Sequence, residues 1–259
     1  MDKVGPMDPK RVRELLEGVQ RGTATVDAAL AELKDLPFAD LGYASVDHHR
    51  ALRQGVPEVI LGEGKTAEQI AGIARELSRS GQNVLVTRLD ASKAKELVVA
   101  LPEVRYSALA RTATLEMRAI APLGTRPVAL ISAGTGDLPV AEECAETLRM
   151  FGVAVERIYD VGVAGIHRLL HKRDVLDRAG VVIVAAGMEG ALPSVVGGIA
   201  QGPVIAVPTS IGYGVSFGGL AALSAMLASC ASGVVVCNID NGFGAAYAAS
   251  RILRNKERY

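Results

Sequence analysis

The chain has 259 residues, enough for one large domain or two modest ones. Hydrophobic residues make up 49% and charged residues 22%, a balance typical of globular proteins that argues against disorder. The 28 Lys and Arg side chains are matched by 28 Asp and Glu, so no bulk positive field favours a nucleic-acid partner. Without a signal-peptide core or an apolar run of membrane-spanning length, we expect a cytoplasmic protein with no membrane partner.

Two short helices are predicted between Pro9 and Leu36, where apolar residues recur at helical spacing. Gly22 separates them, and Pro37 is expected to end the second because proline supplies no backbone donor. From residue 66 to residue 118, helices and strands alternate, which predicts a small α/β domain. Its helices are expected at residues 67–77 and 91–99, and its strands at residues 83–87, 104–107 and 112–118.

A domain boundary is predicted at residues 122–127, where two prolines and a glycine interrupt both periodicities. This gives an N-terminal domain of residues 1–121 and a C-terminal domain of residues 127–259. The second domain is predicted to be a doubly wound, mostly parallel α/β sheet, because its strands are continuous apolar runs of the kind buried between two layers of helices. They are expected at residues 128–132, 153–159, 181–186, 204–207 and 234–238.

Four of these strand ends run into glycine-rich corners, and ligands of such sheets bind at the carboxyl ends of the strands. Glycine lets the backbone approach a ligand closely, and a following helix offers free N–H groups to a phosphate. No corner matches a Rossmann or P-loop fingerprint. One corner alone could be an ordinary turn, but four at one sheet edge favour a binding site. The corners begin at Ser132, Tyr159, Ala185 and Asn238.

The C-terminal half resembles the PurE family of aminoimidazole ribonucleotide carboxylases and mutases. The run Ala133-Gly-Thr-Gly-Asp137 stands where that family has Gly-Ser-x-Ser-Asp, and His167-Arg168 is similar to the end of its Ala-His-Arg. The histidine that precedes Leu-Pro in that family is Ala191 here, with Glu189 two residues earlier. The proton-shuttling role of that histidine is therefore not carried over.

A resemblance over most of the chain is to the LarB family, the pyridinium-3,5-biscarboxylic acid mononucleotide synthases of nickel-pincer cofactor biosynthesis. Its motifs lie at residues 53–60, 64–65, 132–137, 186–190 and, most specifically, 229–245. The resemblance implies a homo-octamer that carboxylates the pyridinium ring of nicotinic acid adenine dinucleotide with CO2. It also implies hydrolysis of the phosphoanhydride with release of AMP, and we expect no organic cofactor.

Such a reaction needs a nucleophile, because a pyridinium ring is too electron-poor to attack CO2. A thiolate that adds to the ring gives a dihydropyridine, whose enamine carbon can attack CO2 before the thiol leaves. The LarB motif places Cys230 in this role. The alternative is a buried, unreactive thiol at the end of an apolar helix over residues 221–230. Cys237, at a strand end, is the second choice, and Cys144 is expected in the core.

A base must also remove the ring proton, and His167 or Glu189 could do so. His167 could instead pack on the helix that bears His171, while Glu189 and Asp137 could contact ribose hydroxyls or cap a helix. Magnesium would neutralise the phosphates during anhydride hydrolysis, with Asp240 and Asn241 as candidate ligands. Asp-Asn-Gly is also an ordinary turn sequence.

The remaining candidates are substrate-binding residues. Asp47, Arg50, Arg53 and Lys65 lie in turns and could engage a phosphate or carboxylate, with solvated surface charge as the alternative. Two other functions stay open: a purine-pathway carboxylase or mutase, against which Ala191 argues, and a nucleotide-binding module that needs no reactive Cys230. The corners supply the other candidates: Ser132, Gly134, Thr135, Gly136, Asp137, Gly187, Met188, Gly190 and Asn238.

Overall fold

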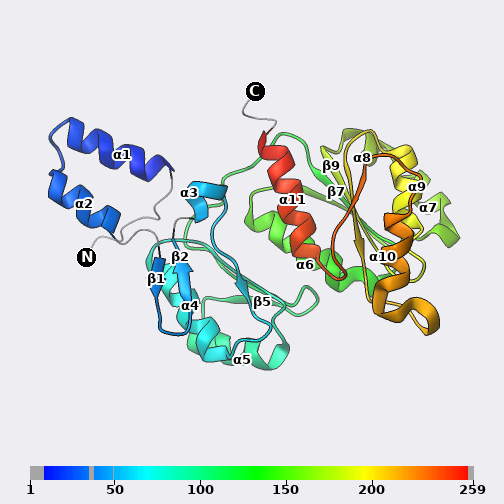
Figure 1. Ribbon diagram of the computed structural model, residues 1–259, viewed down its shortest axis with the longest axis horizontal. Helices are drawn as coiled ribbons and strands as arrows, with labels where there is room; N and C mark the ends of the chain where they lie inside the picture. Colours follow the sequence, from blue (N-terminus) through cyan, green and yellow to red (C-terminus); the bar gives the residue numbers. More distant parts are fainter. Residues whose placement is uncertain (1–8, 35–37, 49, 256–259) are drawn as a thin grey trace. The chain divides into compact units, whose positions relative to one another are not determined.

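The computed structural model describes residues 9–34, 38–48 and 50–255. The chain divides into two compact units, Met1–Ala119 and Ile120–Tyr259 (Figure 1). Across the described residues, no helix has both the length and the apolar character needed to span a bilayer.

The N-terminal unit begins with two helices, α1 (Pro9–Gln20) and α2 (Val26–Lys34), as predicted. Arg11 joins them through an ion pair with Glu32 at 2.9 Å. The proposed stop at Pro37 lies outside the described residues. An antiparallel hairpin of β1 (Phe38–Asp40) and β2 (Ser45–Asp47) follows, and then the short helix α3 (Arg50–Gln54). The sequence patterns did not predict the hairpin or α3.

A four-stranded sheet forms the centre of this unit, in the order β3-β4-β6-β5. Strands β3 and β4 are parallel, and the other pairs are antiparallel. Apolar residues of α4, among them Ile70 and Leu77, pack on Val84 and Val86 of the sheet. The mixed helix and strand pattern of the sequence is confirmed. The elements are β3 (Ile60–Leu61), α4 (Ala67–Arg79), β4 (Val84–Thr87), α5 (Ala91–Ala100), β5 (Arg105–Ser107) and β6 (Thr112–Leu115).

The C-terminal unit holds five parallel strands in the order β11-β10-β9-β7-β8. The chain winds outward from β7 in both directions, so the point where the winding reverses lies between β7 and β9. The predicted doubly wound parallel sheet is therefore confirmed. The strands are β7 (Val128–Ser132), β8 (Val155–Ile158), β9 (Val181–Ala186), β10 (Val204–Pro208) and β11 (Val234–Val236).

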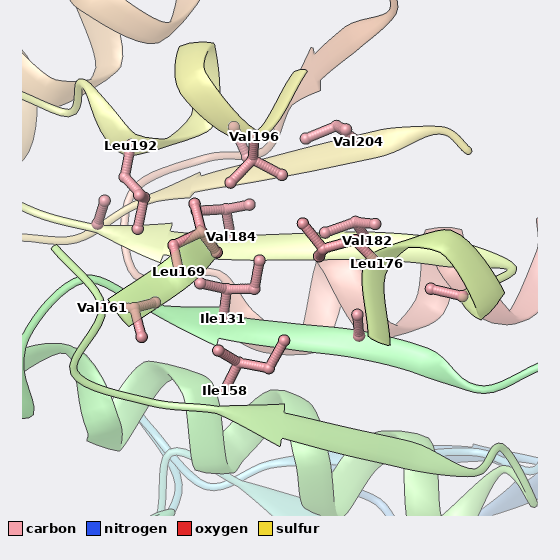
Figure 2. Close-up of a cluster of buried hydrophobic side chains, with 14 of the residues drawn as sticks. Ile131, Ile158, Val161, Leu169, Leu176, Val182, Val184, Leu192, Val196 and Val204 are labelled. Carbon is pink, nitrogen blue, oxygen red and sulfur yellow. The ribbon is translucent and has the colours of Figure 1, made fainter. Parts of the chain in front are cut away.

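Helices cover both faces of this sheet. On one face, α6 (Leu138–Met150) packs beside α11 (Gly242–Asn255), and Cys144 is buried in this layer, as predicted. On the other face, Leu169, Leu192 and Val196 meet Ile131 and Val184 of the strands (Figure 2). The second layer comprises α7 (His167–Leu170), α8 (Arg173–Arg178), α9 (Leu192–Ile199) and α10 (Leu220–Leu227), and three 3-10 turns complete the unit: η1 (Thr135–Asp137), η2 (Val163–Gly165) and η3 (Gly214–Gly219).

Candidate active site

A cavity of about 340 Å³ opens at the carboxyl edge of the five-stranded sheet. It lies where the winding reverses, the usual ligand position in such sheets. The corners after β7, β8 and β9 form its walls, and Ile211, after β10, completes it. The lining residues are Ala133, Gly134, Gly136, Asp137, Gly162, Val163, Ala164, Ala186, Gly187, Met188, Glu189, Ala191, Leu192 and Ile211.

Glycine is required where the corners approach one another. A Cβ at Gly162 would lie 3.0 Å from the carbonyl oxygen of Ala133, which closes the gap between the corners after β8 and β7. Gly190 has a left-handed φ of 65°, and a Cβ there would lie 2.8 Å from the backbone of Ala222 in α10. A side chain at either position would push the corners apart.

Two helices begin at this cavity without a side-chain cap. Neither α6 nor α9 has a side-chain cap, and each carries proline in its first turn, at Pro139 and Pro193. The first N–H groups of a helix point outward and carry partial positive charge. The Leu138 N–H donates to Thr135 O and the Ser194 N–H donates to Ala191 O at 3.2 Å, so the two helix starts contribute mainly partial positive charge to this edge of the cavity.

The two acidic residues of the cavity have different surroundings. Asp137 is buried and accepts hydrogen bonds from Thr209 Oγ1 at 2.6 Å and from the Gly134 N–H at 2.8 Å. Burial raises the pKa of its carboxyl group above the usual value, although these hydrogen bonds oppose the shift. Glu189 is exposed, and no residue of the described chain forms a hydrogen bond or ion pair with it. Glu189 is thus the free carboxylate of the site.

The structure brings six of the predicted residues together in the cavity: Gly134, Gly136, Asp137, Gly187, Met188 and Glu189. Thr135 and Gly190 belong to the same corners without lining it. Ser132 is buried at the end of β7, where its hydroxyl accepts the Asp160 N–H at 3.3 Å. His167 is exposed at the start of α7 and does not line the cavity. Asn238 also lies outside the lining, and its Oδ1 accepts the Ile239 N–H.

The predicted binding residues of the N-terminal unit form internal charge pairs. Asp47 pairs with Arg53 at 2.5 Å and lies 3.9 Å from Arg50, which also lies 3.7 Å from Glu58. Lys65 donates instead to the backbone oxygen of Leu61 at 3.1 Å. These contacts fit the surface-charge interpretation, and a role in binding substrate stays a prediction.

Cys230 is exposed and does not line the cavity. The expectation that it ends a helix is wrong, because α10 ends at Leu227. Its neighbours lie along α9: the hydroxyl of Ser229 is 2.8 Å from that of Ser194, and Ala231 lies against Gly197. All three cysteines of the chain are described, and the others are less accessible. Burial raises the pKa of Cys237 and raises that of Cys144 well above the usual value.

The proposed metal ligands have their oxygens engaged by the backbone. Asp240 Oδ1 accepts the Ser210 N–H at 2.8 Å, and Asn241 Oδ1 accepts the Gly244 N–H at 2.8 Å near the start of α11. Within the described parts of the chain, no three His, Cys, Asp or Glu residues are grouped as metal ligands. Asp240 and Asn241 therefore do not fit a magnesium site built by the chain alone.

Sequence reasoning missed the corner after β10. The sequence does contain the pattern that predicts such a corner, because Pro208-Thr-Ser-Ile-Gly212 follows an apolar strand and ends in glycine, as the other corners follow theirs. Ile211 closes the cavity from this corner, and its carbonyl oxygen accepts the Met188 N–H at 2.8 Å. Met188 itself has a left-handed φ of 51°, which is unusual for a residue with a side chain.

Two family descriptions match the chain. The family described as LarB/PurE-like N-terminal domain matches residues 38–118, and the AIR carboxylase family matches residues 127–259. An uncharacterized protein of Methanocaldococcus jannaschii is 35% identical over 253 residues, which cover 95% of this chain and 98% of the relative. The crystal structure of Treponema denticola PurE is 30% identical, covers 49% of this chain and 80% of that chain, and superposes with a TM-score of 0.39.

Proposed function

The chain belongs to the carboxylase-type family that joins a LarB/PurE-like N-terminal domain to an AIR carboxylase domain, and we propose that it carboxylates nicotinic acid adenine dinucleotide. The ring would gain one carboxyl group from CO2, and hydrolysis of the phosphoanhydride would release AMP. The charge of the cavity carries this proposal. Two acidic residues, Asp137 and Glu189, line it, and none of the Lys, Arg or His residues that the structure describes does. Such a lining favours a positively charged pyridinium ring over an anionic one.

The rest of the cavity suits the same substrate. Val163, Leu192 and Ile211 offer apolar surface to a flat ring, and the small corner residues leave it room. The starts of α6 and α9, which have no side-chain cap, would offer the phosphates the partial positive charge of a helix N-terminus. The proposal therefore places the ring among the corners and the phosphates at the helix ends.

Carboxylation begins when the thiolate of Cys230 forms a bond to a ring carbon and the ring nitrogen takes up the displaced electron pair. The enamine carbon of the neutral dihydropyridine then attacks CO2. Glu189 removes the proton from that carbon, and the nitrogen electron pair expels the thiolate to restore the pyridinium ring. The net change is replacement of one ring proton by a carboxylate, and the thiolate is regenerated.

A second copy of the chain would supply the sulfur, because Cys230 does not line the cavity of its own chain. Residues 190–239, which include Cys230, contain no Asp, Glu, Lys, Arg or His, although 22% of the whole chain is charged. Seven large apolar side chains of this segment are exposed in the single chain, and large exposed apolar surfaces mark interaction sites. They are Ile211, Tyr213, Val215, Phe217, Leu220, Leu227 and Val235.

Association through this uncharged segment would bring Cys230 of one copy to the cavity of another. The number of copies proposed, eight, comes from the family resemblance alone. The proposed need for magnesium rests on the charge of the substrate phosphates, and we assign no step of the reaction to it.

The test is an analysis of products. The purified protein is incubated with nicotinic acid adenine dinucleotide, bicarbonate and magnesium, with a parallel sample in EDTA, and the mixture is analysed by mass spectrometry. We expect AMP together with nicotinate mononucleotide that carries one added carboxyl group. A third sample contains aminoimidazole ribonucleotide, because the AIR carboxylase match favours that substrate as the second candidate. Conversion of only this substrate would replace the proposal, and no conversion of either would favour a binding module.

A further inference from the structure

We propose that Thr209 is a positioning residue that holds the Asp137 carboxylate at the cavity and fixes the spacing of the corners after β7 and β9. Thr209 follows β10 directly and is fully buried, and its hydroxyl donates to Asp137 Oδ1 at 2.6 Å. In the sheet, β9 lies between β10 and β7, so this bond spans the strand whose corner carries Glu189. The inference rests on the proposed function and deepens it.

Asp137 receives donors from the corners after β7 and β10. Besides Thr209, the Gly134 N–H donates to its Oδ2 at 2.8 Å. The corner after β9 joins them through Gly187, whose backbone lies directly against Thr209 Oγ1. Hydrogen bonds to an ionised carboxylate are about twice as strong as neutral ones. A carboxylate whose oxygens already accept hydrogen bonds is poorly available as a base. Glu189, by contrast, has no hydrogen-bond or ion-pair partner in the described chain. We therefore assign Asp137 to fixing the corners and Glu189 to proton removal.

The space around the Thr209 hydroxyl is tightly filled. Its backbone N–H donates to Ala186 O at 3.0 Å, which extends the pairing of β9 and β10 by one residue. A Cβ at Gly187 would lie 2.6 Å from Thr209 Oγ1. The corner after β9 therefore runs directly against the hydroxyl. Valine at position 209 would keep the shape of the side chain and remove only the donor.

The charge state of Asp137 depends on this donor. Burial and the nearby Asp240 raise the pKa of Asp137, and the hydroxyl of Thr209 is the first of the contacts that lower it. Glu189 is the other acidic group at the cavity, and no basic side chain lines it. Loss of the hydroxyl therefore raises the pKa of Asp137 further, so that it takes up a proton at a higher pH. A protonated Asp137 no longer holds the Gly134 N–H as an anion.

The experiment compares Thr209→Val, Thr209→Ser and Thr147→Val in the full-length assembly. Thr147 is the matched control, because it is also fully buried and its hydroxyl donates at 2.8 Å, but to the backbone oxygen of Glu143 within α6. Two quantities are measured: the pH profile of carboxylation, and hydrogen exchange of peptides that contain residues 133–137 and 186–190.

For Thr209→Val we expect the acid limb of the pH profile to move up by about one pH unit and kcat near neutral pH to fall about tenfold. Exchange at both corners should become faster. Thr209→Ser should restore the wild-type profile, and Thr147→Val should not shift it. If Thr209→Val does not fold, Thr209→Ala gives the same comparison. A wild-type pH profile in the Thr209 variant, or the same shift in the control, would overturn the inference.

Hydrogen exchange separates this inference from the proposed function. If the wild-type protein carboxylates neither substrate, the proposed function fails, but the exchange experiment still applies. Faster exchange at both corners in Thr209→Val, with protection restored by serine, would then support the Thr209–Asp137 contact alone. Unchanged exchange would reject it.

Discussion

Helices of the two units begin differently at the edges of their sheets. In the N-terminal unit, Thr66 Oγ1 accepts the Gln69 N–H at 3.3 Å at the start of α4, and Asp90 accepts the Lys93 N–H at 3.0 Å at the start of α5. In the C-terminal unit, α6 and α9 begin at the cavity with no side-chain cap. Similar strand–helix units are therefore capped by their own side chains in the N-terminal unit and lack such caps at the cavity of the C-terminal unit.

The charged residues show the same contrast. At the corresponding edge of the N-terminal sheet, Arg88 lies 3.3 Å from Glu63, and Lys93 lies 3.3 Å from Asp90. Glu189, at the edge of the C-terminal sheet, has no such partner among the described residues. Charged side chains that form ion pairs within the chain have a structural role, whereas a carboxylate without an ion pair stays available for chemistry. We therefore expect catalysis in the C-terminal unit, and four experiments test this expectation.

The largest effect is expected for Cys230→Ser. Loss of the nucleophile should lower carboxylation by at least about 10³-fold, because a serine hydroxyl is a far weaker nucleophile than a thiolate. Product formation is measured by mass spectrometry, with Cys237→Ser as the control. Activity that survives in Cys230→Ser would rule out the thiolate mechanism.

Glu189→Gln should lower carboxylation by about 10²-fold or more, since the amide cannot accept the ring proton. Substrate binding, measured by calorimetry, should be retained. The control is Glu63→Gln, which removes a paired carboxylate from the edge of the other sheet and should leave turnover unchanged. A strong loss of turnover in the control would contradict the contrast between the two edges.

Mixed assemblies test which copy supplies the sulfur. When Cys230→Ser and Glu189→Gln chains are co-expressed, sites that pair the intact Cys230 of one copy with the intact Glu189 of another should form. We expect roughly a quarter of wild-type activity to return, the statistical share of such pairs. No recovery in assemblies shown by mass spectrometry to contain both chains would mean that each site uses its own cysteine.

The smallest effect is expected for Thr66→Ala. Loss of the α4 cap should cost about 1 kcal/mol of unfolding free energy in the N-terminal unit, without altering turnover at a temperature where the protein is folded. Thermal unfolding followed by circular dichroism measures the first effect. Reduced turnover of the folded variant would show that this end of α4 takes part in the reaction.

Long buried strands were the most predictable part of the fold. The bounds of β7 and β9 agree with the predicted residues 128–132 and 181–186, because apolar runs closed by glycine corners have few other structures. The strands β1 and β2 span three residues each and carry no measurable periodicity, so the hairpin was missed. The corners after β7, β8 and β9 could be predicted from glycine and from the rules of parallel sheets, whereas the corner after β10 was missed.

The position of Cys230 could not be predicted in the same way. Its distance from the cavity depends on where α10 ends and how the following turn lies along α9, and neither is encoded in a local pattern. Thr209 was missed for a related reason. Its partner Asp137 lies 72 residues earlier, so only the strand order brings the two side chains together.

The close approach of Gly190 to Ala222 would couple the proposed subunit association to the proposed role of Glu189. Because there is no space between this corner and the first turn of α10, any displacement of α10 also moves the corner that carries Glu189. If a neighbouring copy holds α10 in place, dilution to the point of dissociation would misplace the base without any change of sequence. Specific activity should then depend on enzyme concentration, falling as the assembly separates and returning when it is concentrated again.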